Sequence, residues 1–132
     1  MVVDTSALIA IALREPEWRA LATVIDASDL PMIATVNWVE AGMVMVGKKD
    51  DVGALAIIDE IVTSLGIEIE AIGRAEAIEA RRAFVRYGKG LHPARLNFAD
   101  CFAYALAKAR GVPLLFKGDD FARTDIVPAW RP

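Results

Sequence analysis

Hydrophobic positions along this chain form two kinds of pattern, short continuous runs and longer stretches with a helical period. The short runs lie at 1–4, 31–34, 67–70 and 113–116, and a weaker one lies at 126–129. A run of about four apolar residues between turn residues is typical of a buried strand. Five strands are therefore predicted, the last of them from the weakest pattern.

Longer stretches, with apolar residues three to four positions apart, predict six helices. They lie at 5–13, 17–27, 36–47, 51–65, 74–87 and 98–110. We expect Thr35 to cap the third helix, Gly66 to end the fourth, and Gly111, with Pro113 after it, to end the sixth. Because strands alternate with helices, we expect a three-layer α/β fold with a central, mostly parallel sheet of four to five strands flanked by helices.

Length and composition indicate one domain. The chain has 132 residues, of which 55% are hydrophobic and 25% charged, and it contains no linker-like segment or repeat. A single domain over residues 1–132 is therefore expected. The one cysteine, Cys101, forms no intrachain disulfide, and its apolar helix favours a core residue over a nucleophile. The first residues lack a basic leader and no apolar run reaches the ~20 residues of a membrane span, so we expect a cytoplasmic protein.

Charge is distributed unevenly along the chain. The net charge is −3, but residues 1–73 carry four basic and twelve acidic side chains, whereas residues 74–132 carry eleven basic and six acidic ones. The basic half is either an ordinary solvated helix surface or a face that binds a polyanion. The candidate cations are Arg81, Arg82, Arg86, Lys89, Arg95, Lys108 and Lys117. Arg82 and Arg86 share a helix face, and with Lys89 they could form a stripe that contacts phosphates.

Several acids stand among apolar neighbours, where carboxylates are rarely found without compensation. Asp4 ends the first strand, at the sheet edge where α/β proteins present ligand-binding groups. It is followed by Thr5 and Ser6, and any of the three would also serve as a helix cap. Glu40 lies on or beside the apolar stripe of its helix, so it either points into a polar pocket or extends from the edge of the stripe into solvent.

The second half of the chain supplies three more acids. Asp100 lies in an almost wholly apolar helix, where Asn97 and Asp100 also have the spacing of a capping box. Asp119 and Asp120 follow the strand at 113–116, in a turn where Asp often bonds its own backbone. Each position therefore has a purely structural explanation as well as a chemical one.

Taken together, these acids indicate a metal site. The carboxyl ends of parallel strands share one edge, so Asp4 and the Asp119–Asp120 turn are expected to lie near each other, with two helix starts close by. Like charges held close together repel, and such a cluster persists mainly when a cation neutralises it. All the candidate ligands are oxygens, which favours Mg²⁺ or Mn²⁺ over zinc.

Four segments, VVDTSAL, TVNWVEAG, LNFADCFAYALAKA and LLFKGDDFARTDI, occur in the order and spacing of a known family. In them the chain resembles the PIN-domain nucleases, and more narrowly the VapC-type ribonuclease toxins of bacterial toxin–antitoxin pairs. The resemblance spans the whole chain and implies a PIN-like α/β fold and metal-dependent hydrolysis of RNA. It also implies an RNA substrate, a cognate VapB-type antitoxin that covers the groove, and a homodimer.

The resemblance assigns roles residue by residue. It implies that Asp4, Glu40 and Asp100 are the catalytic, metal-binding carboxylates, and that Thr5 or Ser6 is the hydroxyl that holds a metal-bound water. The fourth acid falls within Asp119–Asp120. Asp119 is the preferred ligand, with Asp120 anchoring the turn or contributing beside it. Ala99 stands where the family often has Gly, and it still leaves room for close backbone approach.

Three other functions compete with a nuclease. A receiver domain has similar length and acids, and Lys117 matches its lysine, but no phosphate-accepting Asp ends a central strand here. A haloacid-dehalogenase-like phosphatase requires a second acid two positions after Asp4, where this chain has Ser6. The third is a binding module whose acidic pocket accepts a basic partner side chain without chemistry. His92, the one histidine, is interpreted as a loop residue rather than a base.

Overall fold

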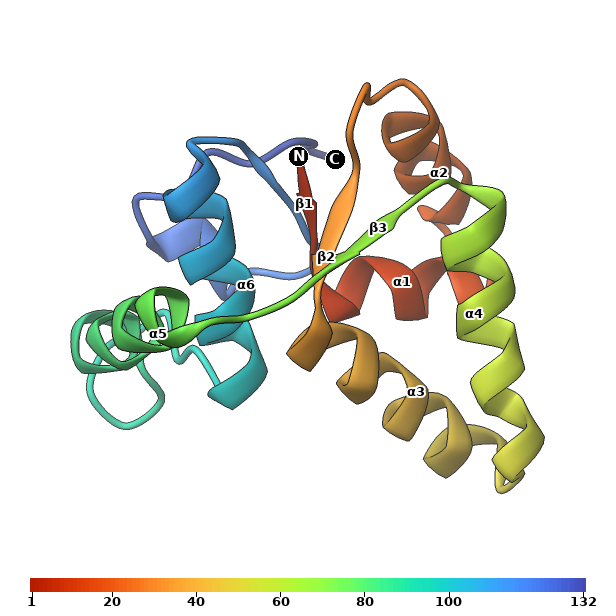
Figure 1. The fold of residues 1–132 in the computed structure, drawn as a ribbon, viewed down its shortest axis with the longest axis horizontal. Coiled ribbons are helices and arrows are strands. Elements are labelled where there is room, and N and C mark those ends of the chain that lie inside the picture. Colours follow the sequence, from red (N-terminus) through yellow and green to blue (C-terminus); the bar gives the residue numbers. More distant parts are fainter.

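Four short parallel strands form the central sheet, in the order β3-β2-β1-β4 (Figure 1). The computed structural model describes residues 1–132. The strands are β1 (Val2–Val3), β2 (Met32–Ala34), β3 (Glu68–Glu70) and β4 (Leu114–Leu115). All three pairings are parallel, with Val2 opposite both Met32 and Leu114. The predicted parallel sheet is confirmed, with four strands.

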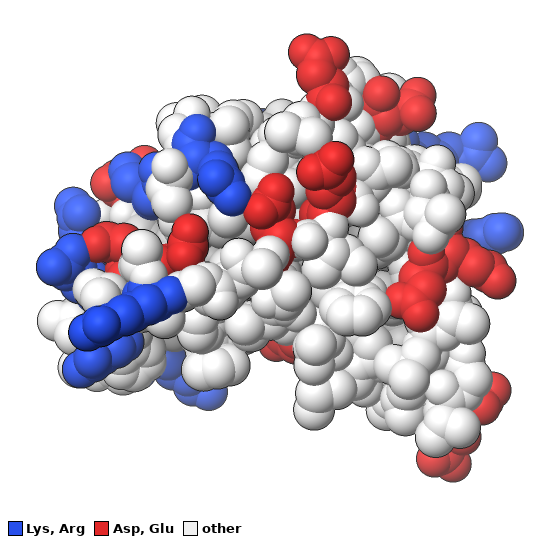
Figure 2. Space-filling model, viewed as in Figure 1, with Lys and Arg blue, Asp and Glu red and all other residues white.

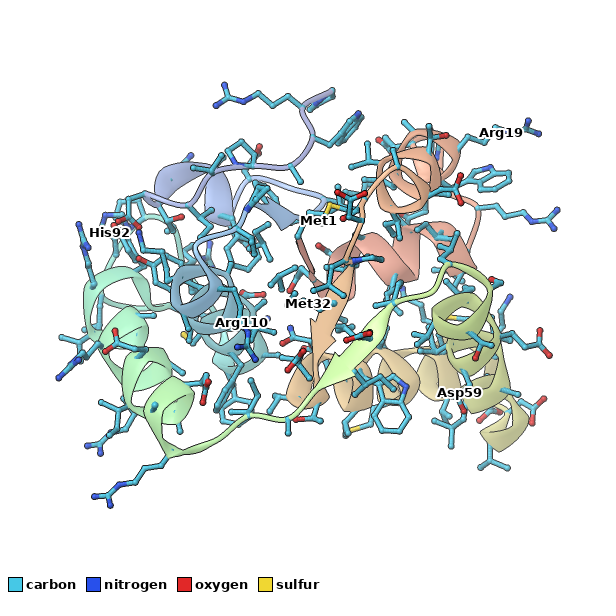
Figure 3. The ribbon with its side chains drawn as sticks, turned by 45° about the horizontal axis from the view of Figure 1, so that its top comes forward. Met1, Arg19, Met32, Asp59, His92 and Arg110 are labelled. Carbon is cyan, nitrogen blue, oxygen red and sulfur yellow. The ribbon has the colours of Figure 1, made fainter.

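Alternation along the strands divides the interior into two hydrophobic cores. Val2 and Leu114 face one core, while Val3 and Leu115, the next residue in each strand, face the other. This follows from the geometry of a strand, in which successive side chains point to opposite faces of the sheet. Met32 lies in the middle of the molecule, between the helical layers (Figure 3). The three predicted layers are therefore confirmed.

Helices cover both faces of the sheet. One face carries α1 (Thr5–Ala12), α2 (Trp18–Asp26), α3 (Thr35–Lys49) and α4 (Leu55–Ser64), and the other carries α5 (Arg74–Tyr87) and α6 (Phe98–Arg110). In Figure 1 the first group lies to the right of the sheet and the second to the left. Two short 3-10 helices, η1 (Val52–Ala54) and η2 (Phe121–Arg123), complete the chain. No helix is both long enough and apolar enough to cross a bilayer.

Two predicted helix ends are confirmed and one cap is wrong. Gly66 and Gly111 have φ values of 61° and 64°, the left-handed conformation that ends helices and that glycine adopts without steric cost. Thr35 is the first residue of α3 rather than its cap. The strand β2 runs directly into the helix, so Ala34 stands in the cap position, where its methyl group can accept no hydrogen bond.

The fifth predicted strand, 126–129, is reduced to a single bridge. Pro128 pairs with Leu114, and the flanking bonds are Leu114 N–H to Val127 O and Ala129 N–H to Leu114 O. The segment does lie beside β4, at this one position. In this register residues 127 and 129 make the bonds to Leu114, and the backbone nitrogen of Pro128 points away from β4, so a proline is accommodated at this edge.

Candidate metal centre

Asp4 lies where the sheet meets two helical layers. Its backbone N–H donates to Leu115 O over 2.9 Å, so it follows β1 at the end of the β1–β4 ladder. Its side chain is only 2% exposed. Oδ2 accepts from the backbone N–H of Ser6 at 2.9 Å and from the Ser6 hydroxyl at 2.6 Å, and Asp4 is the N-cap of α1. Asp4 thus caps a helix and is also the buried member of the group Asp4, Glu40 and Asp100, which we call the acidic pocket.

Glu40 reaches this pocket from α3 and is half-buried. The Thr5 hydroxyl lies 2.5 Å from Glu40 Oε2 and donates to it. The sequence left two explanations open for this acid, a polar pocket or the edge of an apolar stripe. The bond to buried Thr5 shows that Glu40 points into the pocket.

Asp100 enters from the other helical layer. It is the third residue of α6 and 8% exposed, and its Oδ2 accepts the Asn97 N–H at 2.8 Å. Asn97 in turn accepts the Asp100 N–H at 2.9 Å, so the predicted capping box is present. A carboxylate in the first turn also suits the helix dipole. Like Asp4, Asp100 therefore caps a helix and also belongs to the acidic pocket.

The acids influence one another strongly. The pKa of Asp4 is raised to about 6, chiefly by burial and less by the charge of Glu40, against the lowering effect of the Ser6 bonds. The pKa of Asp100 is raised to about 7, chiefly by burial and less by the charges of Asp4, Asp120 and Glu40. Each carboxyl therefore resists ionisation because it is desolvated and faces other negative charges.

Asp119 and Asp120 are both exposed, in the turn after β4. Asp120 is among the charges that raise the pKa of Asp100. It stands just before η2, but its side chain makes no capping bond there, which leaves its carboxylate free. Electrostatics therefore associates Asp120 with the pocket, whereas the sequence favoured Asp119 as the fourth acid.

A hydroxyl links the pocket to the loop that carries the fourth acid. Ser6 Oγ accepts the backbone N–H of Lys117 at 3.0 Å while it donates to Asp4. The Lys117 ammonium pairs with Glu15 and Glu17 in the connection between α1 and α2. Lys117 is therefore held away from the pocket, and it does not neutralise the acids there.

The donor set suits a hard divalent cation. Every candidate ligand is a carboxylate oxygen, the type that Mg²⁺ and Mn²⁺ prefer. No lysine or arginine forms an ion pair with Asp4, Glu40 or Asp100, so the negative charge of the pocket is not neutralised by the protein. In this arrangement no three acidic side chains converge closely enough to share one ion. The pocket fits a metal because of its uncompensated negative charge and its oxygen ligands, although the side chains do not form a complete coordination site in this arrangement.

One residue of the pocket was missed by the sequence analysis. Asn37 in α3 is fully buried, and its amide donates to Asp4 Oδ1, Thr5 Oγ1 and Ala99 O at 3.2, 3.3 and 3.2 Å. The available signal was its position three residues before Glu40, which places both side chains on one side of a helix. A search for acids alone does not detect such an amide.

The basic half of the chain forms one side of the molecule. In Figure 2 most of the blue side chains gather over α5 and α6. Most of the red side chains lie nearer the sheet and the layer of α1 to α4. Several predicted cations are already paired: Arg82 with Glu79, Arg86 and Lys108 with Asp125, and Lys117 with Glu15 and Glu17. Arg81, Lys89 and Arg95 form no ion pair within the chain.

The two remaining chemical candidates have structural roles. His92 lies in a loop at the outer end of the α5–α6 layer (Figure 3), where its Nδ1 accepts the Ala94 N–H at 3.0 Å. Cys101 is buried in the core, and burial raises the pKa of its thiol to about 11. A thiol with this pKa is inert at neutral pH.

Comparison with known proteins identifies relatives over the full length of the chain. The family described as PIN domain matches residues 1–127. "VapC ribonuclease Mb0640" of Mycobacterium bovis is 37% identical over 132 residues, which is all of both chains. "Ribonuclease VapC42" of Mycobacterium tuberculosis is 40% identical over 130 residues, or 98% of each chain.

Solved structures show the same fold at lower sequence identity. The crystal structure of Mycobacterium tuberculosis VapC20, described as a "Sarcin-Ricin loop cleaving toxin", superposes with a TM-score of 0.78 at 16% identity, over 99% of this chain and 98% of that one. A "Toxin-antitoxin complex from Klebsiella pneumoniae" gives 0.70 at 20% identity, with the same coverage. These likenesses confirm the arrangement of the sheet and its helical layers.

Proposed function

This chain belongs to the PIN-domain family, alongside the VapC ribonucleases, and we propose that it is a Mg²⁺- or Mn²⁺-dependent endoribonuclease, the toxin of a type II toxin–antitoxin pair. The observation that carries the metal dependence is the uncompensated charge of the pocket, where Asp4 and Asp100 have pKa values raised to about 6 and about 7. A divalent cation removes this repulsion and restores the ionised carboxylates.

Asp4, Glu40 and Asp100 would hold the metal, together with Asp120 or Asp119 from the turn after β4. A bound Mg²⁺ or Mn²⁺ supplies Lewis acidity toward a phosphoryl oxygen and a water of lowered pKa. The protein's part is orientation. The hydroxyl of Thr5 donates to Glu40 and that of Ser6 donates to Asp4, so each hydroxyl fixes the direction of one carboxylate.

An acidic pocket repels an RNA backbone, so the substrate requires cations nearby. The loop 88–96 offers Lys89 and Arg95, both exposed and unpaired, around a hollow of about 490 Å³. A bridge between Gly88 and Leu96 closes the base of this loop. We therefore place phosphate contacts at Lys89 and Arg95 rather than on the stripe of Arg82 and Arg86, whose charges are partly cancelled by their partners.

Protein partners are part of the same proposal. Phe84, Val85 and Phe98 are exposed on α5 and α6, beside an apolar hollow of about 730 Å³. Exposed apolar patches of this kind are typical of protein–protein contacts. They support both expected partners, a VapB-type antitoxin and a second copy of the chain. With RNA as substrate, the protein would act in the cytoplasm.

The decisive experiment is cleavage of total bacterial RNA by purified, antitoxin-free protein in Mg²⁺, in Mn²⁺ and in chelator. Discrete fragments are expected with metal only, and Asp4→Ala and Asp100→Ala should abolish them while the circular dichroism spectrum stays native. Asp26→Ala, which removes an exposed acid at the end of α2, is the matched control and should cleave normally.

The competing function is a binding module whose acidic pocket accepts a basic side chain. Folded wild-type protein that cleaves no RNA in either metal would favour that module. Metal binding without cleavage would instead point to a missing substrate, to be sought among individual transfer, ribosomal and messenger RNAs.

A further inference from the structure

Asn37 occupies the point where three elements of the pocket meet. It belongs to α3, and its one amide group donates to the end of β1 at Asp4, to the start of α1 at Thr5 and to α6 at Ala99. The two protons of the amide are thus shared among three acceptors, and none of the three bonds is longer than 3.3 Å. No other side chain of the pocket bonds to β1, α1 and α6 at once.

We infer that Asn37 is a positioning residue, which fixes the Asp4 carboxylate and holds the start of α6, and with it Asp100, against Asp4. The inference rests on the proposed function, in which Asp4 and Asp100 together hold a metal ion. Ser6 fixes one oxygen of Asp4, Oδ2, and Asn37 fixes the other, Oδ1. With both oxygens bonded, the carboxylate has one orientation in the pocket.

The bond to Ala99 extends this control to the other helical layer. Ala99 directly precedes Asp100, and its carbonyl lies 3.2 Å from Asn37 Nδ2. A carbonyl has two lone pairs, so it can accept from Asn37 in addition to its helical partner. The small side chain of Ala99 permits this approach, and the distance between Asp4 and Asp100 is then set through one amide.

The amide of Asn37 is oriented by the bonds that it donates. Asn37 Oδ1 is buried and has no hydrogen-bond partner. An unsatisfied buried polar atom is destabilising, so the bonds on the donating side hold the amide in this orientation. The amide nitrogen, by contrast, donates to Asp4 and to two residues that lie beside the acids, Thr5 and Ala99.

The test compares Asn37→Ala with a matched variant, Met45→Ala, which removes a fully buried side chain from the same helix but from the core behind the pocket. Mn²⁺ binding to the folded proteins is measured by calorimetry. Asn37→Ala should weaken binding by roughly 10–100-fold, as is usual for residues that orient metal ligands. Met45→Ala should bind as wild type does, although it unfolds at a lower temperature.

Two further readouts separate positioning from a general structural effect. On RNA, Asn37→Ala should lower kcat with KM nearly unchanged, and Asn37→Ser, which keeps one donor, should recover part of the loss. In chelator, a double-mutant cycle should show that Asn37→Ala shifts the urea midpoint less in an Asp4→Ala background than in wild type.

The outcomes distinguish this inference from the proposed function. If wild type binds Mn²⁺ and Asn37→Ala binds it equally well, or if the two substitutions are additive in the cycle, Asn37 does not position Asp4. If wild type binds no Mn²⁺, the proposed metal centre is wrong. The double-mutant cycle needs no metal. Non-additive effects of Asn37→Ala and Asp4→Ala on stability would therefore still show that Asn37 positions Asp4, and additive effects would overturn the inference.

Discussion

Lys117 and Ser6 are 111 residues apart in the chain, yet the backbone N–H of Lys117 donates to the Ser6 hydroxyl over 3.0 Å, and that hydroxyl donates to Asp4. The side chain of Lys117 secures this contact, because it pairs with Glu15 and Glu17 beyond the end of α1. The two carboxylates raise the pKa of the ammonium. The loop that carries Asp119 and Asp120 is thus held at two points, by Ser6 in α1 and by Glu15 and Glu17 in the connection that follows α1.

Removing the ammonium should loosen this loop. In Lys117→Met we expect a melting temperature lower by roughly 2–5 °C, because two carboxylates lose their shared partner. We also expect a severalfold lower kcat, because Ser6 is held less firmly. Lys48→Met, an exposed lysine near the end of α3 that forms no ion pair, is the control. Equal melting temperatures for the two variants would contradict the role of the Lys117 pairs.

The neighbouring acids Asp119 and Asp120 should contribute unequally. The charge of Asp120 acts on Asp100, so Asp120→Asn should weaken Mn²⁺ binding by about tenfold and lower kcat. Asp119→Asn should have a smaller effect on both quantities. Calorimetry and cleavage rates on the two single variants decide the assignment. A larger effect of Asp119→Asn than of Asp120→Asn would make Asp119 the fourth ligand, as the sequence favoured.

Without metal, the pocket should make stability depend on pH. Asp4 and Asp100 have pKa values of about 6 and about 7, above their ordinary value of 3.8. The folded protein therefore binds more protons than the unfolded chain between about pH 4 and pH 7, and its stability should fall as pH rises through that window. Thermal unfolding in chelator from pH 5 to pH 8 measures this decline.

Asp100→Asn should remove much of that dependence. At pH 8 in chelator the variant should melt roughly 3–6 °C above wild type, because one of the repelling charges is gone. The asparagine can still accept the Asn97 N–H, so the helix cap is kept. Near pH 5 the two proteins should melt within about 2 °C of each other, since Asp100 is then protonated. A lower melting temperature for Asp100→Asn at pH 8 would show that capping outweighs repulsion.

RNA affinity should depend on the loop 88–96. With a labelled RNA oligonucleotide in an Asp4→Ala background, replacing both Lys89 and Arg95 by Ala should flatten the dependence of log affinity on log salt by about 1–1.5, the loss of two phosphate contacts to a single strand. Replacing Arg82 and Arg86 together is the matched control, and it should change the slope less because both are ion-paired. If replacing Arg82 and Arg86 flattened the salt dependence more, the phosphate contacts would lie on α5 instead.

Much of the fold follows from local patterns. The positions of all four strands and six helices agree with the hydrophobic runs and periods to within a few residues. Runs such as Leu114–Leu115 and the glycines at 66 and 111 act locally, through burial and φ. Thr35 and the segment 126–129 differ because their outcome depended on neighbours: Thr35 follows β2 without a turn, and the segment 126–129 meets β4 only at Leu114.

The acids of the pocket and the supports next to them in sequence could be predicted, but the supports from other elements could not. Asp4, Glu40 and Asp100 stood out because carboxylates among apolar residues require compensation. Asn37 and the Lys117 pairs did not stand out, because their partners lie in other elements. An amide in a helix or a lysine after a strand looks ordinary until the fold brings Ala99 or Glu15 beside it.

By itself, the sequence determined the order of strands and helices, the carboxylates at the ends of strands and the starts of helices, and the likeness to a family. These features are encoded locally, in hydrophobic period, residue type and spacing. Only the tertiary structure decided which charges remain unpaired, which of Asp119 and Asp120 acts on Asp100, and that one amide joins β1, α1 and α6. Those properties depend on distances between residues far apart in the chain, because electrostatic and hydrogen-bond energies change within a few ångströms.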